Sequence, residues 1–225
     1  MARELTAGDL ARLFAKVAEA IEHDRDRLCA LDGVIGDGDH GVTMSIGFGA
    51  VEQALNTLDV TASDPTTVFN CAAKAFLNAV GASAGPLYAT ALMRAGAAVK
   101  GKRTLDDDGI VASIVAMAKG VQDRGKAARG EKTMIDAWLP AADATLAARA
   151  EGKDMTACLA AAAKAAADGA EATKAMVATK GRSARLGERT LGHVDAGAAS
   201  TALFLATLAT GVAALQGAVP AAMKA

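Results

Sequence analysis

The sequence has few aromatic residues and no excess of either charge. Phe, Trp and Tyr make up 3% of its 225 residues, and runs of Val, Ile, Thr and aromatics, which favour strands, are scarce. The formal net charge is −1, so the chain lacks the basic surface by which proteins bind nucleic acid or anionic membranes. We therefore expect neither a sheet-based fold nor a nucleic-acid partner.

Cysteine is also scarce. Cys29, Cys71 and Cys158 are far apart and form no Cys-x-x-Cys pair, which argues against a disulfide framework and against a zinc site. The first residues carry an acid at Glu4 and lack the apolar run of a secretory signal. We expect three small buried thiols in a reducing, cytoplasmic environment.

Charge is absent from residues 196 to 223, a stretch long enough to cross a bilayer. The stretch is rich in Ala, Gly, Thr and Ser, however, and such residues are only weakly apolar on membrane-insertion scales. A helix buried among close neighbours explains this composition better than a membrane span does, so we expect no membrane span.

What the sequence does have is alanine, its commonest residue and the strongest intrinsic helix former. Hydrophobic residues make up 52% and charged residues 22%, a globular balance, and no long linker or repeat divides the chain. We predict a single all-α domain over residues 1–225, with eight helices in an up-and-down bundle. The predicted helical segments are 7–30, 44–55, 65–80, 87–95, 105–121, 133 onward with a kink near Leu139, 156–179, and 195 onward.

The Gly-rich stretch from Asp32 to Gly41 is predicted to be a loop, and it holds Asp32, Asp37 and Asp39. Three carboxylates so close together repel one another unless a cation shares them. A hard divalent ion bound by oxygen is the natural partner, and Mg²⁺ fits best where phosphates and waters complete its coordination. Two alternatives stay open from these residues alone: a solvated Asp-Gly turn, and a calcium site without the EF-hand spacing.

Two other Gly/Lys stretches superficially match a phosphate-binding P-loop. In residues 96–103, Arg103 stands where a magnesium-binding Ser or Thr is required, and a helix is predicted before the stretch instead of a strand. In residues 125–133, Glu131 displaces the pattern by one position. If a nucleotide binds to this protein, it binds through a motif other than a P-loop.

Four ordered motifs make the pattern specific. The first is Gly36-Asp37-Gly38-Asp39-His40-Gly41 with Asp32 five residues before Asp37; the others are 80–88, 125–138 (including Gly130-Glu131-Lys132-Thr133-Met134) and 181–197. Together they resemble the nucleotide-binding L subunit of dihydroxyacetone kinase. This family implies an eight-helix antiparallel up-and-down barrel with the nucleotide at one rim.

The resemblance also implies roles for particular residues. Asp32, Asp37 and Asp39 would be the catalytic acids and would bridge two Mg²⁺ ions that hold the diphosphate of ADP or ATP. The remaining nucleotide contacts would be His40, Gly41, Val42, Thr43, Ser83, Ala84, Gly125, Met134, Arg182, Asp195, Ala196 and Gly197. The second loop reads Gly81-Ala82-Ser83-Ala84-Gly85, where the family commonly has Gly-Gly-Ala-Ser-Gly, so the Ser lies one position early and a backbone contact is expected there.

In the family, a histidine of a separate K subunit holds the ketose covalently, so this chain is expected to lack a complete substrate site. It would be a phosphotransferase subunit that presents the phosphoryl group. Its bound ADP would be rephosphorylated in place by an M-type donor of the phosphotransferase system, or would exchange with free ATP. Two other hypotheses are a nucleotide-dependent regulator of a transcription factor and a fatty-acid kinase; the latter family has Thr where this chain has His40.

Overall fold

The computed structural model of the protein describes residues 3–81 and 83–217, so Ala82 of the second motif lies outside it. In this part of the chain there are helices and no strand, with one isolated bridge between Leu5 and Leu105. The all-α prediction is confirmed. The helices are α1 (Ala7–His23), α2 (Arg25–Ile35), α3 (His40–Asn56), α4 (Pro65–Ala79), α5 (Ala84–Ala98), α6 (Asp107–Gly125), α7 (Ile135–Ala150), α8 (Met155–Ala172) and α9 (Ala196–Leu215), with the 3-10 helices η1 (Thr173–Ala175) and η2 (Ser183–Thr190).

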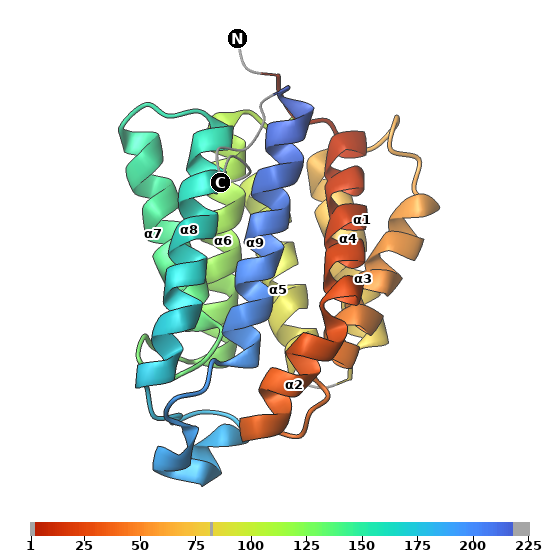
Figure 1. The fold of residues 1–225 in the computed structure, drawn as a ribbon. Coiled ribbons are helices and arrows are strands. Elements are labelled where there is room, and N and C mark those ends of the chain that lie inside the picture. The colour runs from red at the N-terminus through yellow and green to blue at the C-terminus, as the bar shows by residue number, and fades with distance from the viewer. Residues whose placement is uncertain (1–2, 82, 218–225) are drawn as a thin grey trace.

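The long helices pack side by side around a common interior (Figure 1). From α3 to α9 each helix packs on the next along the chain, and α1 packs on both α3 and α9. The short helix α2 lies at the lower end in Figure 1, as does η2, while the start of α1 and the end of α9 lie at the upper end. The loops that hold the four motifs lie at the lower end.

The helix starts follow the side chains that cap them. Thr6 and Asp9 form a reciprocal capping box at α1, and the Asp64 side chain accepts from the Thr67 N–H ahead of α4. At α9, the Asp195 side chain accepts from the backbone N–H of Ala198. These three predicted starts are confirmed.

The described residues form nine α-helices where eight were predicted, and several predicted boundaries are wrong, two of them by many residues. The first helix breaks at Asp24, whose carboxylate accepts from the Arg27 side chain, and a second helix then continues to Ile35. Asp32 therefore lies in the last turn of α2. The loop is confined to residues 36–39, which are called the acidic loop below. The helix predicted to reach Thr179 ends at Ala172, followed by a 3-10 turn in which the Thr173 hydroxyl donates to the Ala170 carbonyl.

An aromatic cluster joins four helices in the interior of the bundle. Phe48 of α3 lies against Phe76 of α4, Tyr88 of α5 and Phe204 of α9, with ring centroids 5.2, 5.6 and 5.7 Å apart. Aromatic pairs at these separations attract one another beyond the area that they bury. The cluster fixes the helices from which the lower rim of the bundle is built.

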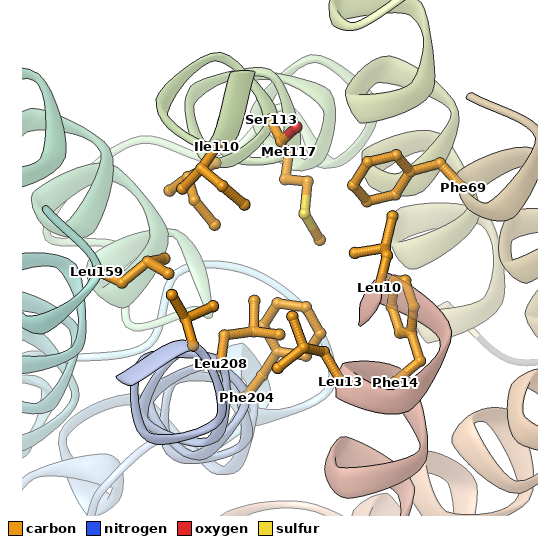
Figure 2. Close-up of a pocket in the computed structure, with 12 residues that line it drawn as sticks. Leu10, Leu13, Phe14, Phe69, Ile110, Ser113, Met117, Leu159, Phe204 and Leu208 are labelled. Carbon is orange, nitrogen blue, oxygen red and sulfur yellow. The ribbon is translucent and has the colours of Figure 1, made fainter. Parts of the chain in front are cut away.

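Within the described residues, a small apolar cavity lies in the bundle interior (Figure 2), lined by residues near the start of α1 and the end of α9. Its volume is about 20 Å³, and it is lined by α1, α4, α6, α8 and α9. Ser113 is the polar residue in the lining, and its hydroxyl donates to the Gly109 carbonyl of its own helix. The space is a packing gap in the core and lies away from the acidic loop.

Helix α9 is, within residues 3–81 and 83–217, the one helix long and apolar enough to cross a membrane. However, 56% of its most apolar window is buried inside the structure, where α9 packs on α1 and α8. This burial agrees with the predicted core helix; residues 218–223 of the uncharged stretch lie outside the described part. Of the three free cysteines, Cys158 is buried as expected, while Cys29 and Cys71 are half-buried.

Asp9 gives the fold a dependence on pH. Burial by itself would raise the pKa of Asp9, but hydrogen bonds from Thr6 and the Arg12 guanidinium outweigh it and lower the pKa. A lowered pKa in the folded state stabilises the fold above the unfolded pKa of about 3.9, and this contribution is lost as the pH falls through the folded value. We expect Asp9→Asn to lower the free energy of unfolding by about 1–3 kcal/mol at pH 7 and by less at pH 3.

Urea unfolding at the two pH values checks this expectation, with the exposed acid variant Asp143→Asn as the control. An equal loss of stability at both pH values would contradict the role given to the Asp9 carboxylate.

Candidate functional site

The acidic loop is shaped by two glycines. A Cβ atom on Gly36 would lie 2.2 Å from Oδ1 of Asp32, so only glycine leaves room for that carboxylate. Gly38 has φ +78°, in the left-handed region that glycine adopts without steric penalty. The loop can therefore turn sharply and carry Asp37 and Asp39 back toward Asp32 at the end of α2.

The three carboxylates converge. Asp32, Asp37 and Asp39 each place an oxygen within 4.8 Å of the others. Oδ2 of Asp32 also accepts from the backbone N–H of Asp39 at 3.0 Å and of His40 at 3.4 Å. The start of α3 thus orients one carboxylate, while Asp37 and Asp39 remain exposed to solvent.

This donor set fits a hard divalent cation. It consists of carboxylate oxygens alone, close enough to share one or more ions and open on the solvent side, where further oxygen ligands can complete the coordination. The guanidinium of Arg182, from the segment before η2, forms an ion pair with Asp37. Positive charge from a distant part of the sequence is therefore directed at the same carboxylates.

The first turn of α3 supplies the next predicted residues, His40, Gly41, Val42 and Thr43. Nε2 of His40 lies 2.9 Å from the Ser200 hydroxyl of α9, and burial lowers the pKa of His40 although Asp32 opposes the shift. The Val42 side chain is exposed to solvent.

Gly41 has a structural role besides its place in the motif. A Cβ atom at this position would lie 2.0 Å from the Arg25 carbonyl oxygen and 2.9 Å from Sγ of Cys29. Gly41 therefore lets α3 approach the backbone of α2, which sets the position of Asp32 relative to the loop.

The other predicted residues lie at the same end of the molecule, on other helices (Figure 1). Ser83 and Ala84 begin α5, and Gly125 ends α6; no hydrogen bond or ion pair within the described residues joins them to the acids. Met134 and Gly197 are brought together, since a Cβ atom on Gly197 would lie 3.4 Å from Cβ of Met134. The predicted residues thus form an acidic side and a second side around Met134 and the start of α9.

Asp195 combines a cap with an unusual charge state. Its carboxylate accepts from the Ala198 N–H at 2.8 Å, and desolvation raises the pKa of Asp195 to about 7 despite the nearby Lys132 ammonium. Ala196 follows as the first, buried residue of α9. The predicted segment 195–197 is therefore rigidly attached to a helix N-terminus.

Sequence reasoning assigned no role to three residues that the structure places at this rim. Ser200 bonds to His40, Lys132 is buried, and the carboxylate of Asp136 accepts from the N–H groups of Gly130 and Thr133. Lys132 and Asp136 fall within the third motif, but nothing in a Gly/Lys/Asp-rich loop distinguishes a buried lysine from a solvated one. Ser200 lies in the uncharged helix and carries no sequence signal.

Comparison with known proteins identifies the family of this chain. The DAK2 domain family matches residues 34–210. The ADP-binding subunit DhaL of a phosphoenolpyruvate-dependent dihydroxyacetone kinase from Listeria innocua is 41% identical over 181 residues, covering 80% of this chain and 83% of the relative. The corresponding DhaL subunit of Escherichia coli is 31% identical over 205 residues, covering 91% of this chain and 97% of the relative.

Among solved structures, the dihydroxyacetone kinase of C. freundii in complex with AMP-PNP and Mg²⁺ superposes with a TM-score of 0.70 and 26% sequence identity. The superposition covers 93% of this chain and 35% of that chain, so this protein spans about a third of the length of the C. freundii kinase. Since the family match covers most of the sequence and the DhaL relatives align along nearly their full length, the chain belongs to the DAK2 domain family.

Proposed function

We propose that this chain is the ADP-binding subunit of a dihydroxyacetone-type kinase of the cytoplasm. It would hold ADP or ATP through two Mg²⁺ ions at Asp32, Asp37 and Asp39, and would present the phosphoryl group to a ketose bound covalently on a separate K subunit. The observation that carries the proposal is the convergence of three carboxylate oxygens within 4.8 Å at an open rim. Phosphoryl transfer depends mainly on positioning and on charge neutralisation, and this arrangement suits both.

Each side of the rim has a part in this proposal. Bound Mg²⁺ would neutralise the charge that develops on the leaving ADP. Arg182 adds a positive charge beside Asp37, and the first turn of α3 (His40, Gly41, Val42 and Thr43) would line the phosphates at a helix N-terminus. On the far side, Gly125 and Met134 would border the adenine, residues 195–197 would close the pocket, and Ser83 and Ala84 would contact phosphate or ribose through their backbone.

Exposed apolar side chains beside the acids support a protein partner at the rim. Val34 is 54% exposed at the end of α2, and Val42 and Ile46, one turn apart on α3, are 45% and 53% exposed. Large apolar groups in water next to a reactive site favour a surface that another protein covers. The K subunit with its ketose is the partner that this proposal requires.

The phosphoryl donor is proposed to be an M-type protein of the phosphotransferase system, so that ADP stays bound as a fixed coenzyme. The names of the DhaL relatives, which describe phosphoenolpyruvate-dependent enzymes, support this choice. The alternative is a split dihydroxyacetone or erythrulose kinase subunit that exchanges ADP for free ATP. A further role, as a nucleotide-dependent regulator of a transcription factor, is compatible with the same site.

Native mass spectrometry of the purified protein distinguishes these mechanisms. We expect a mass increase that corresponds to one ADP and two Mg²⁺ ions, retained through buffer exchange and lost on treatment with EDTA. A protein that emerges without nucleotide and binds ATP only at millimolar concentration would contradict the fixed-coenzyme mechanism and favour exchange. A protein that binds neither ADP nor ATP in the presence of Mg²⁺ would contradict the proposed function altogether.

A further inference from the structure

Lys132 is a buried lysine outside the acidic cluster. Lys132 is 2% exposed to solvent, and its backbone has φ +59°, in the left-handed region. A non-glycine residue in that region costs about 1–2 kcal/mol, and burial of an ammonium group adds a desolvation penalty. A residue that is unfavourable on both counts persists only where its surroundings compensate for it.

The compensation comes from oxygen atoms of a distant segment. Nζ of Lys132 donates to the backbone carbonyl of Thr173 at 2.6 Å and to that of His193. The carboxylates of Asp195 and Asp136 lie close enough to oppose the lowering of the Lys132 pKa that burial causes. The ammonium is therefore held by two backbone carbonyls, and the charges of two acids favour its protonated form.

These contacts fasten three segments together. Thr173 follows α8, and His193 lies just before Asp195, the residue that caps α9. The Thr173 hydroxyl in turn accepts from the Asp195 backbone N–H at 2.9 Å. Through one side chain, the loop before α7 is attached both to the end of α8 and to the start of α9.

The attachment lies directly behind one side of the rim. Met134 is two residues after Lys132, and its Cβ lies 3.4 Å from the position of a Cβ built on Gly197. Met134 lies in the loop before α7, on the same segment as Lys132, and Gly197 lies in the first turn of α9. The contacts of Lys132 therefore join the two segments that bring Met134 and Gly197 together.

We propose that Lys132 is a positioning residue for the nucleotide, which holds the Met134 side of the base pocket against the start of α9. The proposal rests on the proposed function, because it assigns the adenine to the space between these two segments. The site then has two halves. The half around Met134 and the start of α9 depends on Lys132, whereas α2, the acidic loop and α3 hold the three acids without a hydrogen bond to Lys132 among the described residues. Loss of Lys132 should weaken binding of the base and spare binding of the diphosphate.

Two ligands separate these effects: ADP, and inorganic pyrophosphate, which lacks the base, each titrated calorimetrically in the presence of Mg²⁺. For Lys132→Met we expect the affinity for ADP to fall about 10- to 100-fold, as for the loss of hydrogen bonds to a charged group, while the affinity for pyrophosphate stays at the wild-type value. The control is Lys174→Met, a half-exposed lysine one residue beyond Thr173 that pairs with Glu171. It should bind both ligands as the wild type does.

Thr173→Val provides a second, independent variant if Lys132→Met does not fold. It removes the hydroxyl that accepts from the Asp195 N–H and leaves Lys132 in place, so we expect the same pattern with a smaller loss for ADP. A folded Lys132→Met protein that binds ADP like the wild type would overturn the proposal, as would an equal loss for both ligands. If the wild-type protein itself bound neither ligand, the proposed function would fail first.

Discussion

Replacing Asp37 by asparagine is expected to abolish Mg²⁺-dependent nucleotide binding while the helical fold survives. Asp37 is an exposed member of the carboxylate cluster, so its loss should leave the interior unchanged. Asparagine keeps the size of the side chain but removes the charge that a divalent ion requires. Because loss of a group that merely supports a metal ligand costs 10- to 100-fold in affinity, loss of a ligand itself should cost on the order of 100-fold or more.

Thermal unfolding with and without ligand measures this effect. At a ligand concentration 100 times the wild-type dissociation constant, ADP with Mg²⁺ should stabilise the wild type by about 2.7 kcal/mol and Asp37→Asn by about 0.4 kcal/mol or less. Without ligand, the two proteins should differ by about 0.5 kcal/mol or less, as is usual for surface substitutions. The control Asp26→Asn removes an acid in the first turn of α2, at the other end of that helix from Asp32; its side chain is 91% exposed, and the variant should respond to ligand like the wild type. Full stabilisation of Asp37→Asn by ADP would rule out its role as a ligand.

Gly41→Ala is expected to destabilise the protein strongly for the addition of a single methyl group. The added Cβ would lie 2.0 Å from the Arg25 carbonyl oxygen, a backbone atom that cannot move without shifting α2. Such overpacking costs about 1–3 kcal/mol. Since α2 also carries Asp32, its displacement should weaken nucleotide binding as well.

Gly49→Ala is the matched control on the same helix. A Cβ at Gly49 meets no atom within 4 Å, so the substitution should stabilise α3 by roughly 0.5–1 kcal/mol through the lower conformational entropy of alanine in the unfolded chain. Urea unfolding of both variants gives the comparison. Equal stability of Gly41→Ala and Gly49→Ala would show that α2 and α3 are not in the close contact described above.

The all-α fold was predictable because its signals are local. Alanine content, the Thr6–Asp9 capping box, the Asp64 and Asp195 caps and the helical spacing of apolar residues each act within a few residues of chain. The break at Asp24 was not predictable, since the apolar stripe of α1 continues past it and glycines obscure the helical character of the next segment. For that reason Asp32 was assigned to a loop, although it lies in a helix.

The candidate site also has a part that could be predicted from the sequence and a part that could not. The acidic cluster was predictable because its three carboxylates are near in sequence, and a glycine loop can bring them together. The contacts of Arg182 with Asp37, of Ser200 with His40 and of Lys132 with Thr173 span from 41 to 160 positions along the chain. Pairings over such distances depend on how the helices pack, and no local pattern encodes them.

A crystal structure of the protein with ADP and Mn²⁺ tests most directly whether the three acids hold the nucleotide through divalent ions. Mn²⁺ replaces Mg²⁺ at oxygen sites, and its anomalous scattering locates each ion without reference to the protein. We expect two anomalous peaks at roughly 2.0–2.3 Å from carboxylate oxygens of Asp32, Asp37 and Asp39, with the diphosphate on their solvent side. Peaks elsewhere, or a nucleotide bound away from these three residues, would contradict the account.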